Sequence, residues 1–348
     1  MKMPEVRGEV GAAVGTLLSS DPGQAGTGAA HAAVDAALAR SQDVLRDEDL
    51  QATLFTLYAL HYRGVEGVDD RWEWSPELLG LRARIEEAFE SVLRAQVDVP
   101  EDVGASGDDV ATALFALAAA DGGPGLSGYV AKRATDDQLH ELLIHRSVYQ
   151  LKEADPHTWA IPRLAGGPKA ALVEIQADEY GGGDPERMHS ALFAGTMRGL
   201  GLDDTYGAYV DQLPAVTLAS VNMMSMFGLH RRLRGAIVGH LAAFEMTSSL
   251  PNRLYGNGFR RHGYDAAVTW YFDEHVEADA VHEQIAGRDL AGKLVEQEPA
   301  LHHDVLFGAA ACLHVDGLVG AHLVERWERG ETALRQPSAA AQTLGRRA

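Results

Sequence analysis

The chain has 348 residues, of which 46% are hydrophobic, and its formal net charge is -20 at pH 7. This length exceeds one average domain, and the acidic balance excludes the basic face that a nucleic-acid partner would need. The single cysteine, Cys312, excludes an intrachain disulfide, a thiolate zinc site and an iron–sulfur cluster within one chain. We find no apolar run of the length that crosses a membrane, so we expect no membrane partner and a cytoplasmic location.

Residues 1–130 contain few clustered ligand-type residues. The first 25 are rich in Gly, Ala and Ser and predict a mobile arm. Apolar spacing and helix caps then predict helices at about 31–38, 50–62, 76–96 and 108–120. We interpret residues 1–130 as a helical scaffold, and the apolar face with Leu54, Leu57 and Leu60 predicts a homodimer.

Residues 131–334 are predicted to be helical as well, and residues 335–348 to form a disordered tail. Helices are expected at about 135–154, 167–180, 184–199, 213–252, 264–298 and 299–329. A kink is expected near Gly228 or Gly239. No alternating strand pattern of useful length is present, so the predicted fold class is all-α, a bundle of six or seven helices.

The helix predicted at 264–298 carries His275, Asp279 and His282 at positions i, i+4 and i+7. Each helical residue turns by about 100°, which places the three side chains within an arc of about 60°. Two imidazoles and a carboxylate on one stripe form half of a metal site suited to iron, manganese or zinc. The alternative is a solvated acidic helix with two incidental histidines.

Further ligands have to come from acids and histidines on other helices. Glu245 lies in the most apolar helix, where an unpaired carboxylate is costly. Glu153, Glu179 and His189 are also candidates, although each glutamate stands beside other charges and has a surface position as its alternative. Glu186, three residues before His189, either replaces or supplements Glu179, or is a helix-terminal acid.

In this order, the seven residues resemble the ligand signature of the haem-oxygenase-like di-iron oxidases and oxygenases, also called iron-containing redox enzymes. The signature is a glutamate, a second glutamate, a histidine, a third glutamate and then His-x-x-x-Asp-x-x-His. It matches Glu153, Glu179, His189, Glu245, His275, Asp279 and His282. The resemblance covers roughly residues 130–330 and is nearest to N-oxygenating members that carry a further cupin domain, for which we expect no counterpart here. It implies a haem-oxygenase-like bundle of about seven helices that binds two iron ions and uses O2 as co-substrate.

The resemblance implies that O2 is used to oxidise the nitrogen of a small amine, guanidine or aminoimidazole in specialised metabolism. Alternatives are oxidative C–C cleavage of a fatty acid or amino acid, and a non-enzymatic iron-binding role. Asp178 is a possible polar contact for a nitrogen-rich substrate, and a surface position is its alternative. No flavin or nicotinamide fingerprint is present, so an external electron donor is expected.

Overall fold

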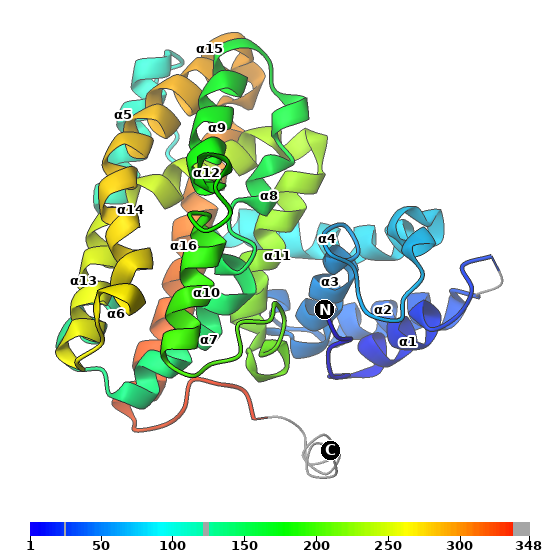
Figure 1. Cartoon of the computed structure of the whole chain (residues 1–348). Coiled ribbons are helices and arrows are strands. Elements are labelled where there is room, and N and C mark those ends of the chain that lie inside the picture. The colour runs from blue at the N-terminus through cyan, green and yellow to red at the C-terminus, as the bar shows by residue number, and fades with distance from the viewer. Residues whose placement is uncertain (24–25, 121–124, 337–348) are drawn as a thin grey trace. The chain divides into compact units, whose positions relative to one another are not determined.

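The computed structural model describes residues 1–23, 26–120 and 125–336, but not the side chains of residues 277–280. All regular structure in these residues is helical, with no strand, which confirms the predicted all-α fold class (Figure 1). The predicted disordered tail falls mainly on residues 337–348, which lie outside the described residues.

The chain divides into two compact units. The first comprises Met1–Gln96, Thr205–Asn222 and the segment from Leu334, and the second comprises Val97–Asp204 and Met223–Ala333. This division differs from the predicted boundary at residue 130, and the roles predicted for the separate parts stay predictions. The boundary between the units also falls within a helix, α11, after Asn222.

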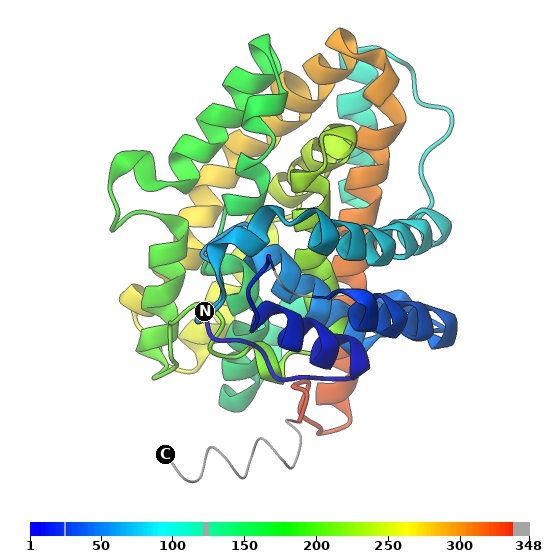
Figure 2. The same cartoon turned by 90° about the vertical axis from the view of Figure 1, so that its right-hand side faces the viewer.

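The first unit is built from helices near the N-terminus, seen from a second side in Figure 2. These are α1 (Glu9–Leu18), α2 (Gly28–Arg40), η1 (Val44–Arg46), α3 (Glu48–Ala59), η2 (Asp70–Trp74), α4 (Pro76–Gln96), η5 (Val210–Gln212) and the start of α11 (Ala215–Leu229). The predicted start of α4 is confirmed, with Pro76 as its first residue and the hydroxyl oxygen of Ser75 accepting from the amide of Leu78.

Helix α1 replaces the mobile arm that was predicted for the N-terminal residues. Val10, Val14 and Leu17 are buried along one of its faces, and the helix packs on α2 and α3. At its start, the carboxylate of Asp49 accepts hydrogen bonds from the amides of Val10 and Gly11, both at 2.8 Å. The prediction was wrong because it weighed Gly, Ala and Ser content above the i, i+4, i+7 spacing of these apolar residues.

Helix α3 is buried from Leu50 to Ala59. Leu54 and Leu57, which motivated the predicted homodimer, are 0% and 2% exposed within a single chain. The homodimer stays a prediction, but this face is already occupied by the chain itself.

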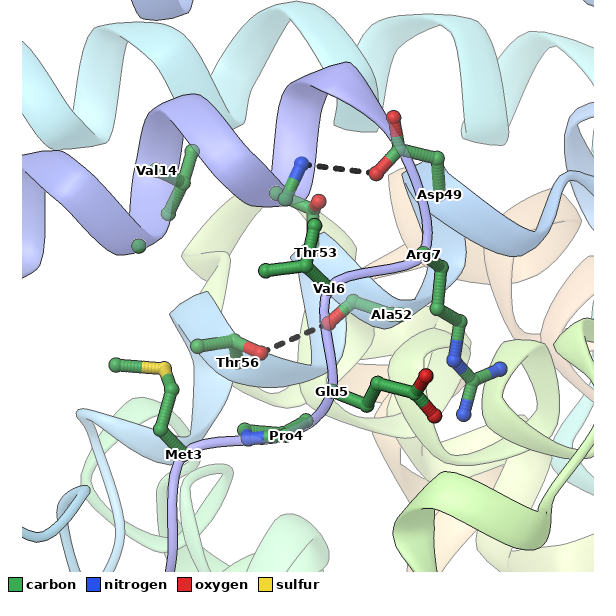
Figure 3. Close-up of a pocket in the computed structure, with 12 residues that line it drawn as sticks. Met3, Pro4, Glu5, Val6, Arg7, Val14, Asp49, Ala52, Thr53 and Thr56 are labelled. Atoms are coloured by element: carbon green, nitrogen blue, oxygen red, sulfur yellow. Dashed lines mark hydrogen bonds between the residues drawn. The ribbon is translucent and has the colours of Figure 1, made fainter. Parts of the chain in front are cut away.

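A small crevice lies beside α3, under the N-terminal segment (Figure 3). Its lining includes Met3, Val14 and Thr53, and its volume of about 30 Å³ leaves room for only one or two water molecules. The hydroxyl of Thr53 is buried there without a hydrogen-bond partner. The crevice is too small for an organic substrate.

The second unit contains the remaining helices. They are α5 (Gly107–Ala120), α6 (Leu126–Lys132), α7 (Asp136–Gln150), α8 (Asp155–Thr158), η3 (Ile161–Arg163), α9 (Gly166–Glu179), η4 (Gly181–Gly183), α10 (His189–Gly199), the end of α11, η6 (Arg231–Leu233), α12 (Arg234–Met246), α13 (Ser249–Arg261), α14 (Ala266–Gln284), η7 (Ile285–Gly292), α15 (Lys293–Gln297), η8 (Pro299–Leu301) and α16 (His302–Glu328). Helix α7 begins with the predicted cap, a reciprocal capping box between Thr135 and Gln138.

Helices α12 and α16 form the centre of this unit, where they run against each other (Figure 1). A Cβ on Gly239 would overlap the carbonyl oxygen of Val305, and one on Gly308 would overlap that of Ala236. Only glycine allows the two backbones to approach so closely. Gly239 is therefore a packing position and not the predicted kink.

Two predicted long helices are interrupted. The region 213–252 is broken after α11 by η6, close to the other expected kink at Gly228, and again between α12 and α13. The region 264–298 changes from α14 into a π-helical stretch, η7. A π-helix differs from an α-helix in its i→i+5 hydrogen bonds, and the spacing of apolar residues over so short a stretch does not reveal this difference.

The segment Pro299–Glu328 is long and apolar enough to cross a membrane by length and composition, which differs from our expectation. More than half of its most apolar 18-residue stretch is buried inside the structure. A helix at the centre of a core passes the same test, so this is weak evidence for a membrane span.

Candidate metal centre

Glu153 lies in the turn after α7, which ends at Gln150 and not at the predicted Ala154. The chain reverses at Ala154, whose φ of 74° is the positive value that L-residues rarely adopt. The carbonyl oxygen of Ala154 accepts a hydrogen bond from Gln176 Nε2 on α9 at 2.9 Å. This contact holds the turn that carries Glu153 against the helix that ends in Glu179.

Glu179 is the last residue of α9 and His189 is the first of α10. The glycines of η4 between them have φ values of 70°, 61° and 91°, which permit a tight turn. His189 Nδ1 consequently lies 2.8 Å from Glu179 Oε2. Helix α10 does not begin at Asp184 as predicted. The residues after Asp184 form a turn, in which the Asp184 carboxylate accepts from the amide of Glu186. Glu186 is exposed and does not replace Glu179 here.

The other candidates lie on α12 and α14. Glu245, His275 and His282 are 6%, 5% and 1% exposed, so the stripe predicted on α14 faces inward at both histidines. Glu245 Oε2 lies 3.5 Å from His282 Nδ1. The side chain of Asp279, the remaining predicted ligand, lies outside the described residues.

These side chains form two groups in which the ligand atoms lie within 4.8 Å of one another. The first group is Glu153, Glu179, His189 and His275, and the second is Glu179, Glu245 and His282. All of them are buried, and Glu179 belongs to both groups. The structure therefore brings together every predicted ligand whose side chain it describes.

Tyr271 holds two members of the first group, and sequence reasoning did not single it out. Its hydroxyl donates to Glu153 Oε1 at 2.9 Å, and its carbonyl oxygen accepts from His275 Nδ1 at 2.8 Å. His275 Nε2 then faces Glu153 Oε1 at 3.5 Å. The available signal was its position four residues before His275, one helical turn away on the same face.

Asp178 makes the corresponding contact in the second group, where its Oδ2 lies 3.0 Å from His282 Nε2. This is a contact to a candidate ligand and not the substrate contact considered above. The available signal was its place beside Glu179.

Burial and neighbouring charges have opposing effects on the pKa of each of these groups, and the pKa values of both Glu245 and His282 are raised. Burial raises the pKa of Glu245, and His282 offsets only part of that effect. Burial lowers the pKa of His282, but the Glu245 and Asp178 carboxylates outweigh it and raise the pKa to about 9. The carboxylates of the site therefore stabilise a positive charge placed between them.

Three buried atoms in these groups make no hydrogen bond: Glu153 Oε2, His189 Nδ1 and His282 Nδ1. Buried polar atoms without a hydrogen bond are costly, and a cation between them would remove that cost. Among the described residues, the ion pairs of Glu153, Glu179 and Glu245 are formed with histidines and not with Lys or Arg. Carboxylate oxygen and imidazole nitrogen suit iron, so the residues present fit an iron centre.

A second pair of buried histidines lies outside both groups. His157 Nε2 is 3.2 Å from His240 Nδ1, and both rings pack on Phe244. Burial lowers the pKa of His157 to about 3, so this ring is neutral. Sequence reasoning missed the pair, because single histidines in apolar segments give no distinctive pattern.

Comparison with known proteins adds three findings. The family model of iron-containing redox enzymes matches residues 140–317, about half of the chain, and this range contains all seven predicted ligands. Nitrosourea synthase of Streptomyces achromogenes subsp. streptozoticus is 28% identical over 148 residues, which are 42% of this chain and 31% of that protein. The chain thus matches about a third of the length of that curated relative.

A crystal structure of a CADD-like protein of unknown function from Nostoc punctiforme has a similar fold, with a TM-score of 0.50 and 16% identity. The match covers 63% of this chain and 97% of that one. The fold, the buried ligand groups and the family match agree with one another. The chain belongs to the family of iron-containing redox enzymes and is an oxidoreductase with the helical haem-oxygenase-like fold.

Proposed function

We propose that this protein is a non-haem di-iron oxygenase that uses O2 to oxidise the nitrogen of a small amine, guanidine or aminoimidazole. The observation that carries the proposal is the pair of buried ligand groups that share Glu179. The similarity to a nitrosourea synthase supports chemistry at nitrogen, although it extends over only 31% of that protein.

The first group, Glu153, Glu179, His189 and His275, would hold one iron, and Glu179, Glu245 and His282 the other. Asp279 is the seventh proposed ligand. When bound, the two ferrous ions would supply the electrons that activate O2 for oxygen transfer, with an external donor restoring them.

Residues around the ligands prepare them for this role. The Tyr271 hydroxyl occupies Oε1 of Glu153 and leaves Oε2 without a hydrogen bond. Its carbonyl oxygen accepts a hydrogen bond from Nδ1–H of His275, which directs the Nε2 lone pair toward the first group. The burial of these side chains keeps bulk water from the site.

The test is anaerobic loading of the protein with Fe(II), followed by isotopically labelled O2 and a panel of guanidines, aminoazoles, amino acids and fatty acids. Mass spectrometry should find an N-hydroxylated or nitro product that contains the label. The matched pair of variants is Glu179→Gln, expected to abolish the product, and Glu174→Gln, an exposed acid on the same helix that should leave it unchanged. A shortened carbon skeleton or an alkene would instead indicate C–C cleavage, and the absence of any O2-dependent product would contradict the proposal.

A further inference from the structure

We propose that Asp178 is a positioning residue that makes His282 bind metal through Nδ1, and that it controls the affinity of one of two metal positions. This inference rests on the proposed di-iron centre. The observation behind it is a contact between an exposed and a buried side chain. The Asp178 side chain is 63% exposed, whereas that of His282 is 2% exposed. The exposed carboxylate reaches the outer nitrogen of a buried imidazole, with Oδ2 at 3.0 Å from Nε2.

A neutral imidazole has one N–H and one lone pair, and the acceptor that takes the hydrogen decides which nitrogen can bind a metal. With Nε2–H directed at Asp178, the lone pair of His282 is on Nδ1. That atom lies 3.5 Å from Glu245 Oε2 and is buried without a hydrogen bond. The second group therefore has its free imidazole nitrogen on the side of the carboxylates.

His275 shows the opposite arrangement on the same helix. Its Nδ1 contacts the main-chain carbonyl of Tyr271 at 2.8 Å, so Nε2 faces the first group. A backbone acceptor is present whatever the side chain, whereas the acceptor of His282 depends on one exposed residue. A substitution at position 178 should therefore act on the second group and leave the first unchanged.

The position of Asp178 in α9 strengthens this selectivity. Asp178 and Glu179 are consecutive residues at the end of the helix, one exposed and the other buried. Helix α9 thus provides Glu179, the ligand shared by both groups, on its buried side, and Asp178, the contact to His282, at the preceding position. Because Asp178 is exposed and outside the core, its substitution should not unfold the protein.

The first experiment titrates metal-free protein with Co(II), followed by calorimetry and visible absorption. Wild type should show two binding events. In Asp178→Ala one event should weaken by roughly 10- to 100-fold, the range typical for loss of a carboxylate behind a metal-bound histidine, and the other should not change. Asp178→Asn retains an acceptor oxygen and should restore most of the affinity, and Glu174→Ala is the matched control on the same helix.

The second readout is proton NMR of the Co(II) protein, where N–H protons of bound imidazoles give strongly shifted signals. In Asp178→Ala, one of these signals should exchange faster with solvent, while the one from His275 should keep its wild-type rate. If the alanine variant matches wild type in both affinities and exchange rates, the positioning role is overturned and the metal centre stands. If wild type itself binds no more than one ion, the proposed di-iron function fails, and this inference fails with it.

Discussion

Each unit contains a buried cluster of acids, histidines and tyrosines, and the two clusters balance their charge differently. In the first unit, Arg82 Nε lies 3.0 Å from Glu86 Oε1, and Arg82 Nη1 lies 2.5 Å from His61 Nε2. The hydroxyl of Tyr58 donates to the same Glu86 oxygen at 2.7 Å. A guanidinium that is always charged supplies the positive charge of this network.

In the second unit, the ion pairs of three buried glutamates are formed with imidazoles within the described residues. The buried guanidinium of Arg146 interacts with Glu153 through its charge, but no ion pair between the two is among these contacts. Tyr271 again holds a carboxylate, as Tyr58 does in the first unit, but the ion pair of this carboxylate is with His275 and not with an arginine. Several polar atoms there remain without hydrogen bonds. Similar residue types therefore form an ionic network where a guanidinium pairs directly with the carboxylate, and a candidate metal site where the carboxylates pair with imidazoles instead.

The largest expected effect follows from the residue that both metal groups share. We expect wild type to bind about two irons per chain, as in other carboxylate-rich helical bundles. Glu179→Gln removes the shared anionic ligand, so metal analysis should find iron close to background, while circular dichroism stays unchanged. Glu174→Gln should bind as wild type does. Full iron content in the Glu179 variant would show that the groups are not joined through this residue.

The next effect concerns the first unit. Arg82→Met leaves Glu86 buried without its cation, which should lower the free energy of unfolding by about 3–5 kcal/mol. Urea unfolding measures this change, and iron content per folded chain should not fall.

The matched control is Arg84→Met on the same helix, because the ion pair of Arg84 with Asp35 is partly exposed and should be worth less than about 1 kcal/mol. An equal loss in both variants would mean that the buried network is no more important than a surface pair.

A smaller effect should appear in the pH dependence of the metal-free protein. Burial lowers the pKa of His145 to about 3, below its ordinary value of 6.5. The unfolded chain therefore binds the proton more readily, and stability is lost as pH falls from about 6.5 toward 3. Between pH 6.5 and 4.5 this histidine should lower the free energy of unfolding by about 2 kcal/mol.

Urea unfolding of wild type and His145→Gln at several pH values isolates this contribution, because other titrating groups are common to both proteins. The variant should lose less stability on acidification. Parallel pH profiles would contradict the assignment of His145 as a buried neutral imidazole.

The smallest effect tests the strained turn beside Glu153. Ala154→Gly relieves a positive φ that costs about 1–3 kcal/mol and removes one buried methyl group worth about 0.8 kcal/mol, so stability should stay equal or rise. Ala160 is equally buried but has a φ of -75°, so Ala160→Gly should lower stability by about 1 kcal/mol. Equal losses in thermal unfolding would show that Ala154 is not strained.

Sequence reasoning predicted the fold class and the ligands that the structure brings together. The fold class is confirmed because helix caps such as Ser75 and Thr135 and the apolar spacing act locally along the chain. The ligand assignment stays a prediction, although the structure places the described side chains together. The helix predictions failed at α1, where composition was weighed above spacing. They also failed at the start of α10, because the residues after Asp184 form a turn and the helix begins only at His189.

Local sequence patterns were enough to predict that helices form, roughly where most of them lie, and which residue types are available to bind a metal. They could not show that Glu179 belongs to both ligand groups or that His275 and His282 expose different nitrogens, which the folded chain reveals. The folded chain also shows that Gly239 serves close packing and not a kink. The physical reason is that these properties arise between helices far apart in the chain, where distance and orientation depend on how the helices pack and not on the spacing within any one of them.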